Sequence, residues 1–249
     1  TTIQANFDFS SEEDMVKKFR VSQSIQPLII ALYANSPFVS GKLTEYLSYR
    51  SYIWTQTDPR RCGVLPFIYE ENFSFERYVD YLLDVPMYFI IRNNRYVDLT
   101  GNTFKDFLQK KIIDKYEPEL KDWDTHITTV FPEVRLKSFI ELRGADGGPW
   151  SRVCALPAFW TGILYDENVL DEVSGIIDDW SFNDVQNLYA DVRRNGLRTI
   201  VPNGENLIEF SKKILDLSSM GLRNRKIELN GKNEESFLDP LRVILKQGN

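Results

Sequence analysis

The amino-acid sequence predicts an α+β fold, with antiparallel strands in the first 145 residues and a helical tail packed on one side of them. Three observations lead to this fold class. Residues 2 to 9 alternate between apolar and polar side chains, which is the period of a half-buried strand. Residues 137 to 150 alternate in the same way and then enter a glycine-rich turn. From residue 167 onward, amphipathic helical patterns succeed one another.

The first predicted strand has one apolar and one polar face. The apolar face carries Ile3, Ala5, Phe7 and Phe9, and the polar face carries Gln4, Asn6 and Asp8. The spacing from Ser10 to Glu13 is that of a capping box, which begins a helix. This helix is expected to bury its apolar side chains as far as Leu32. A kink or restart is expected at Pro27, because a proline ring removes an amide hydrogen bond.

The middle of the chain has weaker patterns. Residues 36 to 66 show little periodicity and are expected to form a long functional loop, since their aromatic side chains argue against disorder. Residues 73 to 83 have a helical period that places Phe75 and Val79 among the inward side chains. Residues 87 to 99 predict two strands joined by an Asn-Asn turn, which is a β-hairpin.

Two further helices follow from local signals. Residues 103 to 113 predict a short helix. Residues 151 to 165 are apolar on nearly every side, so they predict a buried helix with Pro149 at its first position. Pro157 is expected to bend that helix.

The strand before the glycine-rich turn has two unlike faces. Leu136, Ile140 and Leu142 are expected to point one way, and the other face is expected to carry Arg135, Lys137, Phe139, Glu141 and Arg143. Charges of both signs on one face are typical of a strand that lines a polar, ligand-filled cavity. The alternative is the solvated face of a half-exposed antiparallel sheet.

Composition excludes several classes of function. The formal net charge is -6, without a basic stripe, so nucleic acid is not expected as a partner. No apolar run approaches the roughly 20 residues of a membrane span, so no membrane is expected either. Two cysteines are too few for a disulfide framework, which makes a reducing cytoplasm the expected location. With one histidine, a zinc site is not expected, and any metal should be an oxygen-bound ion such as Mg²⁺.

Several segments together resemble glutamate–cysteine ligase of the plant and proteobacterial type. They are residues 2 to 15 (TIQANFDFSSEEDM), 122 to 137 (DWDTHITTVFPEVRLK), 138 to 150 (SFIELRGADGGPW) and 152 to 160 (RVCALPAFW). The resemblance implies an antiparallel sheet curved around the active site, related to that of glutamine synthetase, with helices on its outer face. It also implies that residues 1–249 are a single catalytic domain fragment, with mixed strands and helices in 1–145 and mainly helices in 146–249.

The reaction implied by the resemblance is an ATP-dependent ligation, the first step of glutathione synthesis. ATP phosphorylates the γ-carboxylate of L-glutamate, and the amino group of L-cysteine then attacks the γ-glutamyl phosphate. Mg²⁺ ions bridge the phosphates and the transferring group. The implied partners are therefore the small molecules L-glutamate, L-cysteine and ATP, bound by a monomer or homodimer.

The resemblance also assigns residues to the site. Glu141 is expected to be a metal ligand and Arg143 a contact to the transferring phosphate, which makes both catalytic. Gln4 and Asn6 are expected to line the nucleotide and metal region, although some bacterial relatives have a metal-binding histidine where Gln4 stands. Arg50 matches an arginine that pairs with the carboxylate of bound glutamate, a bidentate role that suits arginine better than lysine.

Other assignments are more open. Trp54 and Tyr88 are candidates for the wall of the cysteine pocket. The alternative is that both are aromatic residues of the hydrophobic core. Arg61 and Arg135 are possible substitutes for either arginine role. His126 is expected to be a structural hydrogen-bonding residue. Two other functions remain open: a related carboxylate–amine ligase with a different amine acceptor, and a non-catalytic module that keeps the fold.

The family has a long N-terminal part before the strand that contains Gln4, and that part supplies further acidic metal ligands. The fragment is therefore expected to show no ligase activity by itself. A coupled assay of ADP release measures this, and detectable formation of γ-glutamylcysteine by residues 1–249 alone would contradict it.

Overall fold

The computed structural model describes residues 2–110, 115–229 and 231–247. Its chain forms two compact units. Unit 1 comprises residues 1–54 and 133–249, and unit 2 comprises residues 55–132. Helices and small antiparallel sheets occur together, which confirms the α+β class. That the whole chain acts as one catalytic domain stays a prediction.

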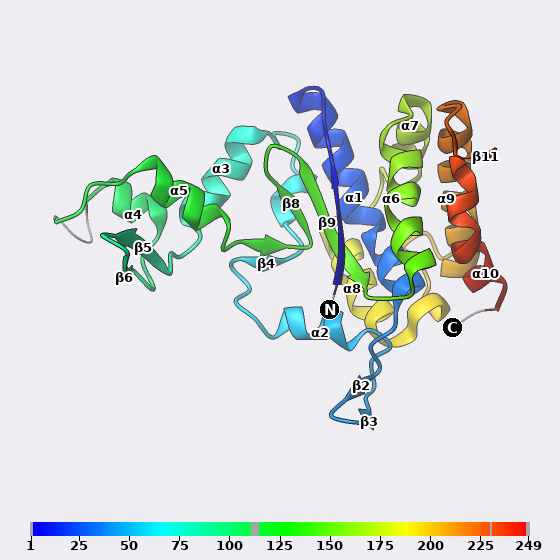
Figure 1. Ribbon diagram of the computed structural model, residues 1–249, viewed down its shortest axis with the longest axis horizontal. Helices are drawn as coiled ribbons and strands as arrows, with labels where there is room; N and C mark the ends of the chain where they lie inside the picture. Colours follow the sequence, from blue (N-terminus) through cyan, green and yellow to red (C-terminus); the bar gives the residue numbers. More distant parts are fainter. Residues whose placement is uncertain (1, 111–114, 230, 248–249) are drawn as a thin grey trace. The chain divides into compact units, whose positions relative to one another are not determined.

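The main sheet of unit 1 has three antiparallel strands in the order β1-β9-β8. They are β1 (Thr2–Phe7), β9 (Ile140–Asp146) and β8 (Val134–Leu136) (Figure 1). Strand β1 confirms the strand predicted over residues 2 to 9, and β9 confirms the strand predicted before the glycine-rich turn. One expectation was wrong: residues 135 to 143 are not one strand, because the amide of Lys137 donates to the carbonyl of Phe139 at 2.8 Å and the chain reverses there.

Helix α1 (Glu12–Tyr33) packs against β9 and is almost completely buried over its second half. Its cap lies one residue later than expected, because the Ser11 side chain accepts from the amide of Asp14 at 3.1 Å. The Asp14 carboxylate in turn accepts from the amide of Ser10 at 2.7 Å.

Helix α1 also continues through Pro27, where a kink or restart was expected. Proline cannot supply the amide that would bond the carbonyl four residues earlier, which is that of Gln23. In this fold the hydroxyl of Tyr189, on α8 (Phe182–Asn195), donates to the Gln23 carbonyl at 3.2 Å. A side chain from a distant helix thus replaces the missing backbone donor.

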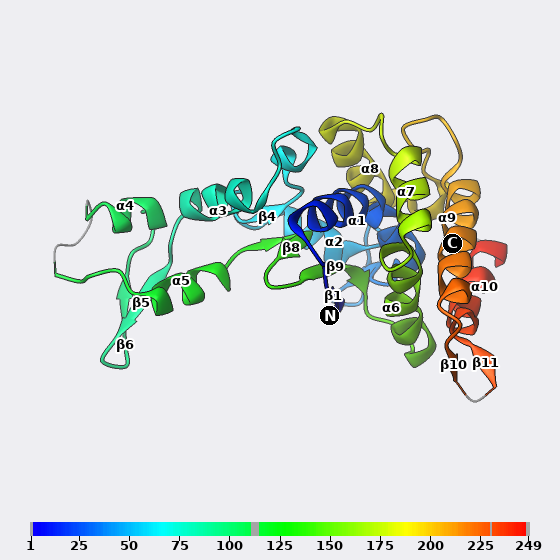
Figure 2. The ribbon, with the colours of Figure 1, turned by 90° about the horizontal axis from the view of Figure 1, so that it is seen from above.

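The tail of unit 1 is helical, as predicted. Its helices are α6 (Trp150–Leu164), α7 (Glu167–Ile176), α8, α9 (Leu207–Asn224) and α10 (Asp239–Gln247), with two 3₁₀ segments, Gly196–Arg198 and Glu234–Leu238. Pro149 is the N-cap of α6 and not its first residue, and α6 continues through Pro157. A short hairpin of β10 (Glu228–Leu229) and β11 (Lys232–Asn233) precedes α10. Helix α7 packs beside α1, and α9 packs against α6 and α7 on the side away from α1 (Figure 2).

Helices α6 and α9 cross with their backbones in close approach. A Cβ atom built on Gly221 would lie 1.8 Å from the carbonyl oxygen of Gly162, a distance that no real side chain allows. Next to this crossing, the Ser218 hydroxyl donates to the Phe159 carbonyl at 2.8 Å. Glycine is therefore required at both positions for steric reasons.

The segment 36 to 66, expected to be one long loop, contains short elements. They are the hairpin strands β2 (Phe38–Val39) and β3 (Lys42–Leu43), the helix α2 (Tyr49–Thr55) and the strand β4 (Cys62–Gly63). Such elements are too short to produce a readable period. The β2–β3 hairpin projects from the rest of unit 1 (Figure 1).

Unit 2 contains the predicted β-hairpin. Its strands are β5 (Phe89–Arg92) and β6 (Arg95–Asp98), and the two central turn residues, Asn93 and Asn94, have φ of 49° and 58°. Positive φ at both positions is what a two-residue hairpin turn requires. The other elements are the 3₁₀ helix Pro66–Tyr69, α3 (Phe75–Asp84), α4 (Phe104–Leu108), α5 (Leu120–Ile127) and the parallel pair β4 and β7 (Phe131–Pro132).

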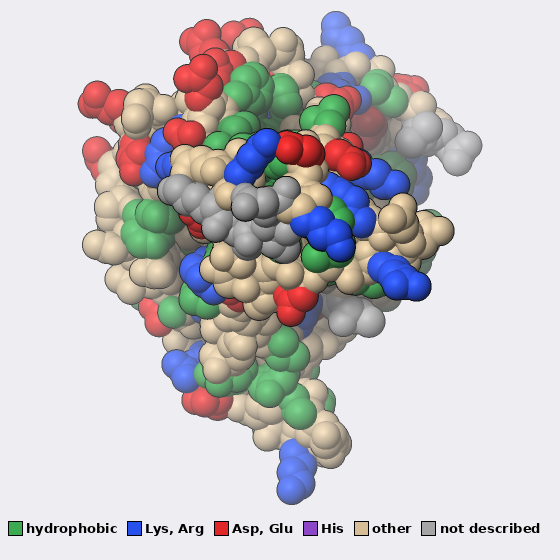
Figure 3. Space-filling model, turned by 90° about the vertical axis from the view of Figure 1, so that its left-hand side faces the viewer, with side chains coloured by type: hydrophobic (Ala, Val, Ile, Leu, Met, Phe, Trp, Pro, Cys, Tyr) green, Lys and Arg blue, Asp and Glu red, His purple; other side chains and the backbone are tan. Residues whose placement is uncertain are grey.

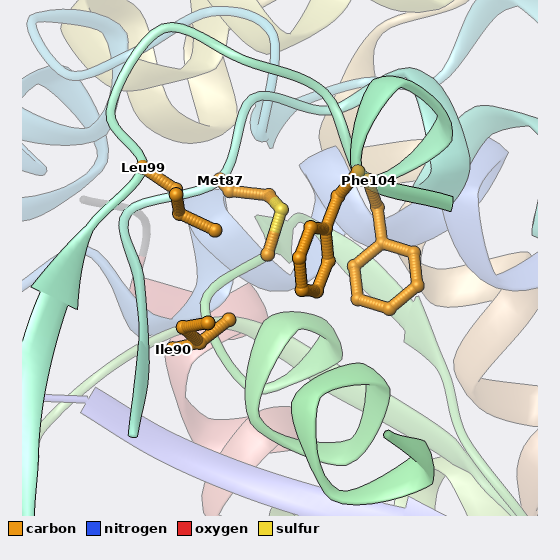
Figure 4. Close-up of a cluster of buried hydrophobic side chains, with 5 residues drawn as sticks. Met87, Ile90, Leu99 and Phe104 are labelled. Atoms are coloured by element: carbon orange, nitrogen blue, oxygen red, sulfur yellow. The ribbon is translucent and has the colours of Figure 1, made fainter. Parts of the chain in front are cut away.

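Unit 2 has its own apolar core. It comprises Met87, Ile90, Leu99, Phe104 and Phe107, four of which are labelled in Figure 4. The inward positions expected for Phe75 and Val79 were wrong, since these side chains are 36% and 42% exposed. The expected helix over 103 to 113 is confirmed for Phe104–Leu108, and residues 111 to 113 lie outside the described residues.

Acidic and basic side chains are interspersed on the face drawn in Figure 3, without a continuous basic stripe. In the part of the chain that the structure describes, no helix has the length and apolarity needed to cross a bilayer.

Substituting Tyr189 with Phe should lower the free energy of unfolding by about 1 kcal/mol, because the Gln23 carbonyl loses its donor. In a Pro27→Ala background, the amide of residue 27 can donate to the Gln23 carbonyl. Tyr189→Phe should then lower the free energy of unfolding by clearly less. A double-mutant cycle by urea denaturation measures the difference. Equal costs in both backgrounds would show that the hydroxyl does not replace the amide.

Candidate functional site

The polar face of the three-stranded sheet brings together residues from all three strands. Glu141 lies at the centre, with Asn6 of β1 as its cross-strand neighbour on one side and Arg135 of β8 on the other. Directly opposed residues on adjacent antiparallel strands have their side chains on the same face. The reversal of the chain after β8 therefore places Arg135 beside Glu141.

Three cations surround the Glu141 carboxylate, and these four residues are called the Glu141 cluster below. Oε2 accepts from Arg135 Nη2 at 2.9 Å and from Lys137 Nζ at 3.1 Å, and Oε1 accepts from Arg143 Nη1. Burial alone would raise the pKa of Glu141, which is only 4% exposed, but the hydrogen bonds from the cations outweigh it and hold the pKa below its ordinary value. Glu141 is thus an anion, and the cluster as a whole is cationic.

The position of Arg143 depends on a bulge in β9. The register runs from Ile3 opposite Ala145 to Ala5 opposite Leu142, so β9 contains one residue more than β1. Bulges commonly re-aim side chains at functional sites. Gly144 lies within this bulge.

Gly144 allows α1 to approach the bulge. A Cβ atom at this position would lie 2.6 Å from the Gln26 side chain. That side chain is itself fixed, because Gln26 Nε2 donates to the Glu133 carbonyl at 2.7 Å. The Arg143 guanidinium, 11% exposed, lies 5.7 Å from the centre of the Trp54 ring. The sequence-predicted residues Glu141, Arg143 and Trp54 are therefore brought together.

Arg50 is held by β9 through two bonds. Its Nε donates to Asp146 Oδ1 at 2.8 Å, and its Nη2 donates to the Gly144 carbonyl. Its Nη1 makes no hydrogen bond to any described residue. The guanidinium is thus anchored along one edge, and pairing of the other edge with bound glutamate stays a prediction.

Gln4 and Asn6 are exposed on the edge strand β1. Neither side chain makes a hydrogen bond within the described ranges 2–110, 115–229 and 231–247. Both amides are therefore available to a ligand, and their nucleotide-binding role stays a prediction.

Tyr88 and Arg61 belong to unit 2. Tyr88 is 39% exposed, and the Arg61 guanidinium lies 3.8 Å from the centre of its ring. Arg61 donates to Asp58, Thr129 and the Pro86 carbonyl, and it is 2% exposed. These contacts hold the Arg61 guanidinium within unit 2, and its use in place of Arg50 or Arg143 stays a prediction. That Tyr88 shares a pocket with Trp54 stays a prediction.

His126 has the structural role that was expected. Its Nε2 lies 2.8 Å from the Leu82 carbonyl, and the side chain is buried. Burial, as the largest cause, lowers its pKa, so the ring is neutral at pH 7.

The described residues do not form a magnesium site by themselves. Among them, no three His, Cys, Asp or Glu side chains gather in a metal-binding group. Both oxygens of Glu141 are engaged by cations, which repel a second cation. Three cations around one carboxylate are better suited to bind an anion such as phosphate than to bind a metal ion. Metal binding at Glu141 therefore stays a prediction that needs further oxygen ligands.

Sequence reasoning missed Asp146. This aspartate ends β9 and is 2% exposed, with Arg50 as one of its partners. The only signal in the sequence was an acidic residue directly before a Gly-Gly pair, at a place where a solvated turn was equally consistent.

Fold and site together define an α+β protein with a largely buried cationic cluster on the polar face of its main sheet. The family model of glutamate-cysteine ligase family 2 (GCS2) matches residues 1–249, and the chain belongs to this family.

Named relatives agree with this membership. The chain is 49% identical to glutamate–cysteine ligase B, chloroplastic, of rice, over 99% of the chain and 49% of the rice protein. Its identity to the chloroplastic glutamate–cysteine ligases of Solanum lycopersicum and Arabidopsis thaliana is 49% and 47%, over 99% of the chain and 46% and 47% of those proteins. The chain spans about half the length of the curated relatives it matches.

The expected cytoplasmic location is contradicted by these relatives, whose names are chloroplastic. The shortage of cysteines argued only against a disulfide framework, and such a shortage does not distinguish one reducing compartment from another.

Replacing Glu141 with Gln should lower the free energy of unfolding at pH 7 by about 3 kcal/mol, because three neighbouring cations lose their common anion. Inorganic phosphate should restore part of that loss by binding the freed cations. Chemical denaturation with and without phosphate measures both effects.

Glu235→Gln is a matched control. Glu235 also accepts from an arginine, Arg223, but its side chain is 28% exposed. Its loss should be smaller, as for solvated ion pairs, and phosphate should change it little. A similar response of both variants to phosphate would contradict specific anion binding at the Glu141 cluster.

Proposed function

We propose that the protein containing this chain is an ATP-dependent glutamate–cysteine ligase, which performs the first step of glutathione synthesis. The proposal rests on membership in glutamate-cysteine ligase family 2 and on one structural observation. That observation is the position of Arg143, which is held on a strand beside Glu141 and against Trp54 within a cationic cluster.

The chemistry has two steps. An oxygen of the glutamate γ-carboxylate attacks the γ-phosphorus of ATP, and ADP leaves. The cysteine amine then attacks the acyl carbon, loses a proton, and releases inorganic phosphate. Phosphoryl transfer depends mainly on positioning and on neutralising oxygen charge.

The Glu141 cluster supplies the charge that this chemistry needs. Arg143, Arg135 and Lys137 together can donate to the oxygens of the transferring phosphoryl group. Glu141 keeps these cations in place before an anion arrives, because it bonds all three. Arg143, beside Trp54, is the cation that we assign to the transferring phosphate.

The remaining roles come from the family resemblance. Arg50 would pair its unbonded edge with a carboxylate of glutamate, and Trp54 and Tyr88 would line the cysteine pocket. Gln4 and Asn6 would face the nucleotide. Mg²⁺ is implied by the family as well, but its ligands must come largely from outside the Glu141 cluster, so no step is assigned to it.

The sheet arrangement proposed for the whole protein is of the glutamine synthetase type. Strand β1 lies at the edge of its sheet in the part described, with exposed residues at alternate positions. An edge of this kind can pair with further strands. A monomer or homodimer would suit this proposal equally.

Arg143→Ala in the full-length protein should remove about 2–4 kcal/mol of transition-state stabilisation, since a preorganised donor to the phosphoryl oxygens is lost. This corresponds to a fall in kcat/KM of roughly 30- to 1000-fold. Coupled ADP release with glutamate and cysteine measures it.

Arg225→Ala is the control, because Arg225 pairs with Glu234 at 3.0 Å on another part of unit 1 and should leave turnover near wild type. If Arg143→Ala and Glu141→Gln both stay within a few-fold of wild type, the site is wrongly assigned. Other amines tested in place of cysteine separate a ligase with a different acceptor from the proposed one.

A further inference from the structure

The buried carboxylate of Asp146, at the end of β9, bonds residues at the end of α1 and at the start of α2. Asp146 Oδ2 accepts from the amide of Asn35 at 2.9 Å and from the hydroxyl of Ser36 at 2.6 Å. Asp146 Oδ1 accepts from the hydroxyl of Ser48 at 2.8 Å and from Arg50 Nε at 2.8 Å. The four donors fill the approximately four lone-pair positions of a carboxylate.

These bonds fix the orientation of one guanidinium. Arg50 is attached to β9 twice, at the Asp146 carboxylate and at the Gly144 carbonyl. Two bonds from a planar group prevent its rotation, so the direction of its unbonded Nη1 is set by the position of Asp146. The arginine is therefore oriented before any ligand binds.

Helix α2, which carries Arg50, makes a second contact with β9. Trp54 lies one turn after Arg50 on α2, and its ring contacts the guanidinium of Arg143. Because Gly144 directly follows Arg143, Arg50 is anchored one residue away from the backbone of Arg143. A misplacement of Arg50 would thus occur next to the proposed phosphate contact.

Helix α2 has an independent support on its other side. The Arg193 carbonyl accepts from the amides of Leu47 at 2.8 Å and Ser48 at 3.1 Å. Arg193 Nε donates to the Ser51 hydroxyl at 3.0 Å. With these bonds in place, removal of the charge on Asp146 should change the orientation of the Arg50 side chain more than the position of α2.

We infer that Asp146 is a positioning residue that holds the Arg50 guanidinium with one edge open for the carboxylate of an amino-acid substrate. The inference deepens the proposed function and rests on it, because glutamate is the substrate whose carboxylate Arg50 would bind. Asp146 acts through Arg50 and touches no substrate itself. Ser48 contributes by sharing Oδ1 of Asp146 with Arg50.

The test measures glutamate affinity by calorimetry in full-length wild type, Asp146→Asn, Ser48→Ala and Ser218→Ala. The dissociation constant for glutamate should rise about tenfold in Asp146→Asn and about threefold in Ser48→Ala, since misoriented binding groups lose affinity steeply. The KM for ATP should stay within about twofold of the wild-type value. General damage to the enzyme would instead weaken the binding of both substrates. Ser218→Ala removes a buried bond between α6 and α9 and should leave glutamate affinity unchanged.

A double-mutant cycle with Arg50→Lys separates positioning from a structural role. In the Arg50→Lys background, Asp146→Asn should cause no further loss of glutamate affinity, because its effect passes through Arg50. An additive loss would overturn the inference, as would wild-type glutamate affinity in Ser48→Ala, which decides the matter if Asp146→Asn does not fold. Absence of glutamate binding to the wild type would instead refute the proposed function.

Discussion

The polar face of the β1-β9-β8 sheet depends on the neutralisation of one buried carboxylate. Glu141 is tolerated in a buried position because Arg135, Lys137 and Arg143 bond it directly. The converse also holds, since three cations so close together would repel one another without Glu141. The sheet therefore contains a preformed arrangement of three cations around one carboxylate, which is the arrangement that we propose to bind the transferring phosphate.

Strand β9 carries two buried carboxylates with opposite surroundings. Glu141 faces an excess of cations, and each of its bonds is charge-assisted. Among the described residues, Asp146 pairs with one cation, Arg50, and its other hydrogen bonds come from two hydroxyls and an amide. The first arrangement can exchange a partner for a ligand oxygen, whereas the second is closed and serves to fix geometry. The bulge at Gly144 lies between them.

Sequence patterns predicted the elements whose signals are local. The alternation of residues 2 to 9 and the Asn93–Asn94 turn were sufficient to identify β1 and the β5–β6 hairpin. Glu141 and Arg143 were identified together because they are two residues apart on one strand. Their presence on one face is confirmed, and their catalytic roles stay predictions.

What could not be predicted depends on contacts between distant residues. The reversal after Leu136 brings Arg135 opposite Glu141, and no period in the sequence reports a turn of three residues. The continuation of α1 past Pro27 requires a hydroxyl 166 residues away. The partner of Arg50 lies 96 residues further along the chain, in a turn that could equally have been solvated.

The touching backbones of α6 and α9 at Gly162 and Gly221 have a mechanical consequence. Where side chains separate two helices, repacking can alter their spacing, but here main-chain repulsion fixes the spacing. The spacing of α6 and α9 is therefore rigid. Because α6 also contacts β1, the edge strand packs against a helix pair that cannot easily change its spacing.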